Sequence, residues 1–302
     1  MGSLAIYGPA IPYWTDVIAK HLGGTVLTPL MASSPTPIDH LVMVGCYYRS
    51  VEEAEDGIKF ILSAKRCLVV FCGSDLLHVR NLPARERDGL IGVLGERSRE
   101  IAVDGTAATQ REAEDLVQRP VHRLRLPPPQ VFPFSPIPVS NDVLLYCSPE
   151  NRDFYGFSLV MDTAALVPDL RFHLYHILGF PGQLSLPNCI CHPKRVWDME
   201  PLYRNSLCAL RFTAHDTLPM TCIEAMMVGR PVLTHHKEVP HAFVTEPTPD
   251  KVAEALRAIR ELARVDPRCC ESASRYYHKN HGVGQFRADV FRLLGYDPPA
   301  VN

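Results

Sequence analysis

The stretch HDTLPMTCIEAMMVGRPV, residues 215–232, carries most of the information about the fold. It follows an apolar run at 208–212 that is typical of a buried strand, and it begins with a polar turn. Pro219 near the start and Gly229 at the end predict a short helix over Thr221–Val228, and a second strand, Pro231–Thr234, follows at once. Strand, turn, helix and strand in this order form one repeat of a parallel sheet.

The same alternation of strands and helices extends through the rest of the chain. After residue 140 the pattern predicts strand Val143–Cys147, helix Phe157–Leu166, strands Phe172–Tyr175 and Cys189–Cys191, a helix near Glu200–Ser206, and helices Asp250–Ala263 and Ser272–Leu294. Before residue 127 it predicts strand Leu4–Tyr7, a helix near Tyr13–Leu22, strand His40–Cys46, a helix from Ser50 with Ala54, Ile58, Ile61 and Leu62 on one face, strands Cys67–Cys72 and Glu100–Val103, and helix Thr109–Val117. An α/β fold with crossover helices is therefore expected.

A run of prolines divides the two halves. Six prolines fall among the twelve residues 127–138, and such a run favours an extended, semi-rigid backbone. We therefore expect an N-terminal Rossmann-like domain over 1–126, a linker over 127–140 and a second Rossmann-like domain over 141–270. Residues 271–302 are expected to form a C-terminal helix that packs back on the first domain. Ligands of such sheets bind beyond the carboxyl ends of the strands, so the active site is expected in the interdomain cleft.

Composition and charge exclude several classes of protein. The longest apolar run, Cys67–Cys72, is far shorter than the ~18 residues that span a bilayer, and no basic n-region marks a secretory signal. The ten cysteines show no C-x-x-C spacing, which indicates reduced core residues. The formal net charge is −2, without the basic excess of a protein that binds nucleic acid tightly through phosphates. A cytoplasmic location without membrane insertion is expected.

Two carboxylates in the stretch 215–232 are candidates for ligand contacts. Asp216 lies in the turn, and Glu224 lies one turn inside the predicted helix. Backbone N–H groups at a helix N-terminus bind phosphate, and carboxylates accept hydrogen bonds from sugar hydroxyls. A structural interpretation competes with this one, because Thr221-x-x-Glu224 also has the spacing of a capping box. Spacing alone leaves both interpretations open.

The stretch resembles the E-x7-E region of GT-B glycosyltransferases of the family-four type. Glu224, Ala225, Met226, Gly229, Pro231 and Val232 match its second half, and Asp216 stands where the first glutamate is expected. The upstream segment WDMEPLYRNSLCALR, 197–211, is similar to the family as well. The resemblance runs from about Val143 to Phe243. It implies a GT-B architecture of two Rossmann-like domains and a nucleotide-sugar donor.

The resemblance also implies roles for individual residues. Asp216 and Arg152 are the expected catalytic residues, with Asp216 on the sugar hydroxyls and Arg152 on the diphosphate. Arg152 belongs to PENRDFYG, 149–156, in which Gly156 matches the family and Tyr155 stands where a lysine is expected. The remaining donor-binding candidates are Glu224 on the ribose, Arg211, and the residues Thr217, Leu218, Pro219, Met220 and Thr221 around the diphosphate. Acceptor-side candidates are Gly8, Asp75 and His78; Asp75 is equally well explained as an Asx-turn or cap residue.

We therefore expect a glycosyltransferase that moves a sugar, a hexose such as glucose, from a nucleotide sugar to an acceptor hydroxyl. Retention of anomeric configuration follows from the resemblance alone. No metal ion and no cofactor besides the donor substrate are expected, because the histidines lack partners at ligand spacing. The alternatives are a sugar-nucleotide epimerase and a non-catalytic binding scaffold of the same fold.

The acceptor is left open between a small molecule, a saccharide and a hydroxymethylated base in DNA. Five arginines of the first half could line a DNA path, although neighbouring acids nearly cancel their charge; these are Arg80, Arg85, Arg87, Arg97 and Arg99. A base in a duplex would also have to be flipped out to react. The sequence does not indicate an oligomeric state.

Overall fold

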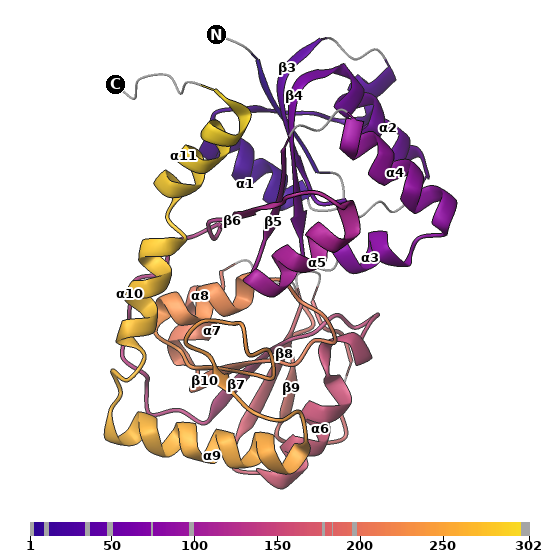
Figure 1. Cartoon of the computed structure of the whole chain (residues 1–302). Helices are drawn as coiled ribbons and strands as arrows, with labels where there is room; N and C mark the ends of the chain where they lie inside the picture. Colours follow the sequence, from indigo (N-terminus) through magenta and orange to yellow (C-terminus); the bar gives the residue numbers. More distant parts are fainter. Residues whose placement is uncertain are drawn as a thin grey trace. The chain divides into compact units, whose positions relative to one another are not determined.

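The computed structural model describes residues 3–8, 12–33, 37–46, 51–73, 75–96, 100–176, 179–182, 184–194 and 198–296. The chain divides into two compact units. The first contains Met1–Pro129 and His281–Asn302, and the second contains Gln130–Asn280. Each unit is built on its own six-stranded sheet, shown with its helices in Figure 1. The predicted fold class, α/β with two Rossmann-like domains, is confirmed; an active site between them stays a prediction.

The first unit has the strand order β2-β1-β3-β4-β5-β6, with every neighbouring pair parallel. Its elements are β1 (Leu4–Tyr7), α1 (Pro12–Leu22), β2 (Thr25–Val26), η1 (Pro29–Ser33), β3 (Ile38–Val44), α2 (Val51–Ser63), β4 (Ala64–Cys72), α3 (Asp75–Asn81), α4 (Ala84–Glu96), β5 (Glu100–Asp104), α5 (Ala107–Val117), β6 (His122–Leu124) and α11 (Val283–Leu294). Parallel neighbours need crossovers, and the helices between the strands provide them.

The second unit has the order β12-β11-β10-β7-β8-β9, again with parallel neighbours throughout. Its elements are β7 (Asp142–Tyr146), η2 (Asp153–Tyr155), α6 (Phe157–Leu166), β8 (Arg171–Tyr175), β9 (Cys189–Cys191), α7 (Glu200–Asn205), β10 (Cys208–Arg211), α8 (Met220–Val228), β11 (Val232–Thr234), β12 (Phe243–Val244), α9 (Pro249–Val265) and α10 (Glu271–Asn280). Every strand and helix predicted between residues 140 and 270 is present, with ends shifted by a few residues.

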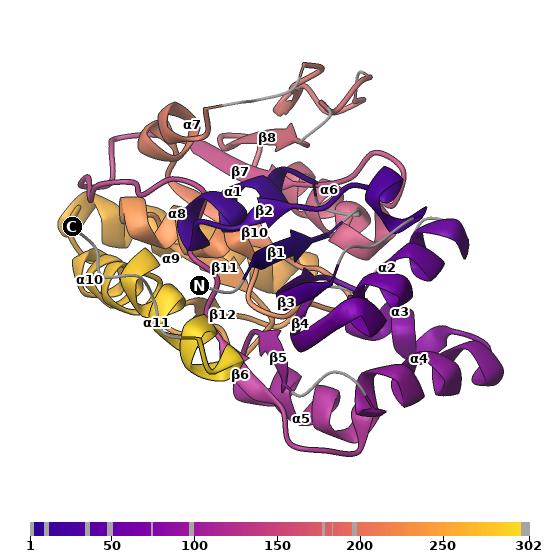
Figure 2. The same ribbon diagram turned by 90° about the horizontal axis from the view of Figure 1, so that it is seen from above.

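Alternating side chains of the central strands serve the two faces of each sheet. In β7, Val143 and Leu145 belong to the cluster with α6 and α9, whereas Leu144 belongs to the cluster with α7 and α8. Successive strand residues point to opposite faces, so a strand covered on both sides is apolar along its whole length. In the first unit, α2–α5 lie on one side of the sheet and α1 and α11 on the other (Figures 1 and 2).

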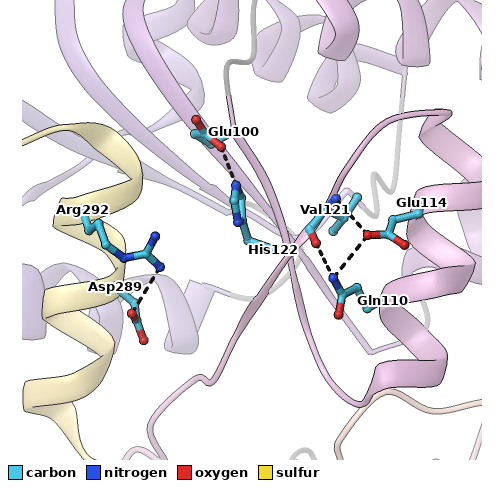
Figure 3. A network of polar contacts seen from close by, with 7 residues as sticks. All are labelled: Glu100, Gln110, Glu114, Val121, His122, Asp289 and Arg292. Atoms are coloured by element: carbon cyan, nitrogen blue, oxygen red, sulfur yellow. Dashed lines mark hydrogen bonds and ion pairs between the residues drawn. The ribbon is translucent and has the colours of Figure 1, made fainter.

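Polar contacts hold the edge strand β6 of the first unit. His122 in β6 lies 2.7 Å from Glu100 in the neighbouring β5, measured from Nε2 to Oε2. On the other side, Gln110 of α5 donates to the backbone oxygen of Val121 at 2.7 Å, and Glu114 accepts from the Val121 backbone N–H at 3.3 Å (Figure 3). Side chains of α5 thereby satisfy the backbone at the start of this short strand.

Three features differ from the sequence prediction. Leu62 is 49% exposed, and Phe60 is buried in its place, because residue 62 lies about 100° around the helix from the buried Ile61. The helical segment 272–294 is two helices, since His281 and Gly282 separate α10 from α11. Helix α10 belongs to the second unit, whereas α11 belongs to the first and contacts β4. Helices α3 and α4 and the short strands β2, β6 and β12 had not been predicted.

The proline-rich segment is integrated into the second unit from residue 130 on. The backbone N–H of Ser135 donates to Val228 at 2.9 Å, and the fully buried Arg230 donates from Nη2 to the carbonyl oxygens of Ser135 and Pro136 at 2.7 and 2.9 Å. Because prolines bring few N–H groups, the carbonyls of this segment take their donors from the sheet domain. The segment expected as a linker is thus anchored over much of its length.

All ten cysteines are unpaired, and six of them are buried, as expected for reduced core residues. Within the residues described above, no helix combines the length and the apolar character needed to cross a membrane.

Gly229 generates a first prediction. Its φ is +90°, and a Cβ there would lie 2.6 Å from Cε2 of Phe134. We expect Gly229→Ala to lower the free energy of unfolding by about 2 kcal/mol or more, from left-handed strain and displacement of the ring. Gly92→Ala is the control, because that Cβ meets nothing within 4 Å and alanine favours the helix. Urea unfolding of both variants measures the effect; equal stability of the two would contradict it.

Candidate functional site

A buried ion pair lies at the carboxyl end of β10. Arg211, the last residue of the strand, contacts Oδ2 of Asp216 through Nε at 2.7 Å and through Nη2 at 2.6 Å. The two side chains are only 11% and 6% exposed. Burial lowers the pKa of Arg211, but the charge and hydrogen bond of Asp216, together with contributions from Cys222 and Tyr155, outweigh it, and the pKa of Arg211 is raised. The guanidinium is therefore a permanent cation in this turn.

Further groups from neighbouring segments fix this ion pair. Thr213 donates its hydroxyl to Oδ2 of Asp216 at 2.9 Å, and the backbone N–H of Thr217 donates to Oδ1 at 3.1 Å. His236, which follows β11, contacts the carbonyl oxygen of Thr213 through Nε2 at 3.0 Å. Asp216 thus accepts hydrogen bonds from four donor atoms and holds the turn between β10 and α8 in one conformation.

Two tyrosine rings lie against the Arg211 guanidinium. Its central carbon is 5.8 Å from the ring centre of Tyr146 and 5.3 Å from that of Tyr155. These distances are in the range of cation–π contacts, and Tyr155 is the residue at which the sequence resemblance predicts a lysine. Burial raises the pKa of the Tyr155 hydroxyl, so it stays neutral. The cation next to the Tyr155 ring is thus Arg211, the last residue of β10.

Helix α8 starts without a side-chain cap. Its N-cap residue is Pro219, and Thr221 is already inside the helix. Thr217, Leu218 and Pro219 are buried, whereas Met220 and Thr221 are partly exposed. A helix N-terminus without a side-chain acceptor presents N–H groups and the positive end of the helix dipole. Of the turn predicted to bind phosphate, 217–221, only Met220 and Thr221 lie in the first turn of this helix, since Pro219 has no N–H and the N–H of Thr217 donates to Asp216.

Glu224 is not a capping residue. The helix begins at Met220, so Glu224 lies a full turn inside it, and the capping-box interpretation is wrong. Its Oε2 instead accepts a hydrogen bond of 3.0 Å from the hydroxyl of Tyr203, and the residue is only 8% exposed. Burial raises the pKa of Glu224 to about 7, although the Tyr203 bond opposes this shift.

Arg152 lies in the loop after β7, against aromatic rings. Its guanidinium carbon is 5.1 Å from the ring centres of both Phe157 and Phe180, and Nε donates to the carbonyl oxygen of Pro149 at 3.2 Å. Gly156 explains how this loop reaches β10: its φ is +67°, and a Cβ would lie 2.6 Å from the carbonyl oxygen of Phe212. The loop with Arg152 and the turn with Asp216 therefore touch through their backbones.

The acceptor-side candidates all belong to the first unit. Asp75 is 2% exposed and accepts from the backbone N–H groups of Cys46 and Cys72 at 2.8–3.0 Å, which ties together the ends of β3 and β4. Burial raises its pKa to about 7. Gly8 accepts the hydroxyl of Thr15 at 2.8 Å, and burial lowers the pKa of His78. The contacts of Asp75 favour its structural interpretation, with the carboxylate used by the backbone.

Sequence reasoning missed the polar partners of the two acids. No role had been assigned from the sequence to Tyr203, Thr213, His236 or Tyr175. A tyrosine on a buried helix face is a usable signal, because its hydroxyl needs a partner. Among the residues that the structure describes, no group of three or more His, Cys, Asp and Glu could hold a metal ion. The expectation of metal independence stays a prediction.

The ion pair generates a second prediction. Arg211→Met leaves Asp216 buried without its cation, and we expect the free energy of unfolding to fall by about 3 kcal/mol. Adding Asp216→Asn removes the isolated charge and should restore more than half of that loss. Arg171→Met breaks an ion pair with Asp142 whose arginine is 58% exposed, and should cost no more than about 1 kcal/mol. A double variant no more stable than Arg211→Met would contradict this account.

The burial of Glu224 generates a third prediction. A carboxyl group with a raised pKa in the folded state favours folding in its protonated form, so its contribution is lost as the pH rises from about 4.5 to about 7. We expect Glu224→Gln to gain up to about 3 kcal/mol relative to wild type between pH 4.5 and pH 8. Thermal or urea unfolding of both proteins across this range measures the difference. A difference independent of pH would contradict the burial of a titrating carboxyl.

Comparison with known proteins adds evidence on the fold. No protein-family model matches the sequence, and no curated protein matches it. Among solved structures, HepE of Anabaena in complex with UDP and glucose matches with a TM-score of 0.72 and 12% identity, over 98% of this chain and 100% of that one. Sucrose-phosphate synthase of Thermosynechococcus elongatus has a TM-score of 0.65 and 14% identity, over 92% and 76%.

TarM matches with a TM-score of 0.63 and 11% identity, over 84% of this chain and 54% of that one. The chain thus spans about half the length of TarM and the whole of HepE. At such identities the likeness concerns the fold. The chain has the GT-B architecture of these glycosyltransferases, with two Rossmann-like α/β domains.

Proposed function

We propose that this protein is a glycosyltransferase that transfers a sugar from a nucleotide sugar, with UDP-glucose as the first candidate donor. The observation that carries the proposal is the match to HepE, solved with UDP-glucose, over nearly the full length of both chains. The charged turn beside the uncapped start of α8 supports it from this chain's own residues. Both lie at the carboxyl edge of the second sheet, where ligands of open α/β sheets bind.

The diphosphate of the donor would bind at the N-terminus of α8. The N–H groups of Met220 and Thr221 at the start of the helix and the positive end of the helix dipole favour an anion there. Pro219 has no N–H, and the N–H of Thr217 is already bound to Asp216. Arg211, charged and held in place by Asp216, supplies a cation at the same turn, and Arg152 supplies a second from the loop that touches it. Together they would stabilise the negative charge that develops on the departing diphosphate.

The sugar and the ribose would contact the two acids. Oδ2 of Asp216 is occupied by Arg211 and Thr213. Among the described residues Oδ1 accepts one hydrogen bond, from the N–H of Thr217, which leaves a lone pair for a sugar hydroxyl. Glu224 would accept from a ribose hydroxyl. Its burial strengthens such a bond, because water does not compete for the carboxylate.

In the proposed reaction the bond between the anomeric carbon and the diphosphate oxygen breaks, and a bond to the acceptor oxygen forms. The hydroxyl proton of the acceptor leaves with the diphosphate. We expect no metal requirement, because the helix N-terminus and the arginines take over the stabilisation of the leaving group. The expectation that anomeric configuration is retained comes from the family resemblance alone.

The acceptor is proposed to be a saccharide or small-molecule hydroxyl. In the first unit Arg80 is paired with Glu112 at 3.3 Å and Arg87 with Asp88 at 3.2 Å, which weakens a DNA path along these arginines. Arg97 and Arg99 lie outside the described residues. Hydroxymethylated DNA therefore enters the experiment as one acceptor among several.

The experiment incubates the purified protein with radiolabelled UDP-glucose and a panel of saccharides, small alcohols and hydroxymethylated DNA, with and without a chelator. Transfer to a member of the panel, undiminished by the chelator, is the expected result. Release of an epimerised sugar would support an epimerase, and binding without any turnover would support a scaffold. Loss of transfer with the chelator, restored by a divalent metal, would contradict metal independence.

Arg152 generates a fourth prediction. If it holds the diphosphate, Arg152→Ala should weaken the binding of UDP about tenfold and leave the binding of uridine nearly unchanged, because only UDP presents the phosphates. Arg171→Ala is the control, since this arginine begins β8 at the opposite edge of the sheet. Calorimetric titration measures both affinities. If the affinities for UDP and uridine fall equally, Arg152 does not bind the diphosphate.

A further inference from the structure

A carboxylate and two tyrosine hydroxyls form a polar row inside an apolar cluster of the second unit. The hydroxyl of Tyr203 in α7 donates to Oε2 of Glu224 in α8 at 3.0 Å. The hydroxyl of Tyr175, at the end of β8, lies 3.5 Å from that of Tyr203. Tyr203 is fully buried and Tyr175 is 4% exposed. Three separate elements thus meet through these groups.

Apolar neighbours keep the row in place. The ring of Phe132 meets the ring of Tyr203 edge-on at 5.9 Å, and the ring of Tyr146 meets that of Tyr175 edge-on at 5.6 Å. Tyr203 and Tyr175 belong to one buried cluster with Ile223. Since protein interiors are close-packed, neither tyrosine can turn away without opening a void. The direction in which the Tyr203 hydroxyl points is therefore set by packing.

The structure itself does not require a carboxylate at position 224. The helix starts at Met220, after the N-cap Pro219, without using Glu224, and a buried carboxyl group costs free energy that an apolar side chain would not. Polar groups that break the pattern of a buried helix in this way are expected at functional sites. The row therefore points to a ligand that needs Glu224.

Tyr203 engages one oxygen of Glu224 and leaves the other for a ligand. The hydroxyl donates to Oε2, and the described part of the chain provides no hydrogen-bond partner for Oε1. The titratable group that contacts Glu224 is Tyr203 from α7. Tyr175 from β8 lies behind Tyr203; burial raises the pKa of Tyr175, Tyr146 raises it further and Arg211 lowers it. A donor on Oε2 favours the carboxylate form, which can only accept on Oε1.

We propose that Tyr203 is a positioning residue, which holds Glu224 so that its free oxygen accepts a hydrogen bond from a ribose hydroxyl of the donor nucleotide. This inference rests on the proposed function and adds to it a residue that selects ribonucleotides over nucleotides without these hydroxyls. Its consequence is a selectivity that depends on pH. Burial raises the pKa of Glu224 to about 7, and loss of the Tyr203 hydroxyl should raise it further.

The experiment compares the affinities of UDP and 2′,3′-dideoxyuridine diphosphate by calorimetric titration between pH 6 and pH 9. Wild type should prefer UDP about tenfold or more at pH 8. Because protonation removes the charged acceptor, this preference should shrink as the pH falls below 7. Tyr203→Phe should reduce the preference at pH 8 to less than threefold and move its midpoint to higher pH.

The matched control is Tyr277→Phe. Tyr277 is a fully buried tyrosine of the same cluster, and its hydroxyl donates to the carbonyl oxygen of Pro240 at 2.9 Å. This variant loses a comparable buried hydrogen bond away from Glu224, so it should keep the preference and its pH midpoint. Replacement of Tyr203 by 4-aminophenylalanine keeps the ring and a weaker donor, and should give an intermediate preference even if the phenylalanine variant does not fold.

The outcomes separate this inference from the function on which it rests. If wild type binds neither nucleotide at any pH, the proposed donor site fails and the inference fails with it. If wild type prefers UDP but Tyr203→Phe, or the 4-aminophenylalanine protein, keeps the full preference and the same pH midpoint, the donor site stands and the role of Tyr203 is overturned.

Discussion

Two opposite charges, on Arg211 and Asp216, are held almost entirely out of water at the end of a central strand. Removing such charges from water costs several kcal/mol for each ion, and the cost is recovered only while the pair and its hydrogen bonds stay intact. Thr213, in the turn from β10 to α8, donates to Asp216. The rings of Tyr146 and Tyr155 lie against Arg211, and Tyr155 belongs to the same loop as Arg152. The pair therefore holds a cation beside the N-terminus of α8, which has no side-chain cap.

The first unit uses a related device without the cation. Asp75 follows β4, and its carboxylate receives backbone N–H groups from the ends of two adjacent strands. Both parallel sheets thus have an acid at their carboxyl edge that orders the loops there. The two acids differ in their partners: Asp75 accepts from backbone N–H groups, whereas the turn at Asp216 is also lined by the side chains of Arg211, His236 and Tyr155.

The contact between Glu224 and Tyr203 differs from the contact that a helix-capping glutamate makes. A capping glutamate would lie at the rim of its helix, close to water, whereas Glu224 lies among apolar residues with one tyrosine as its donor. Burial of the Glu224 carboxyl group costs free energy whether or not a ligand is bound. A bound hydroxyl that pairs with the carboxylate would offset part of that cost, which links affinity to the protonation of a single side chain.

Local patterns determined the elements and their order. Apolar runs, Pro219, Gly229 and the alternation of strands and helices were sufficient to predict two parallel sheets, because these signals act over a few residues of the chain. They also brought Asp216 and Glu224 to the start of one helix. The prediction was wrong for the exposed Leu62 and missed α3 and α4, whose patterns are weaker.

Only the tertiary structure decided which partner each acid has. Arg211 pairs with Asp216, Tyr203 reaches Glu224 from another helix, and Arg152 lies between two phenylalanine rings. These partners depend on strand order and helix packing, and no spacing along a single sequence encodes the distance between side chains on different elements.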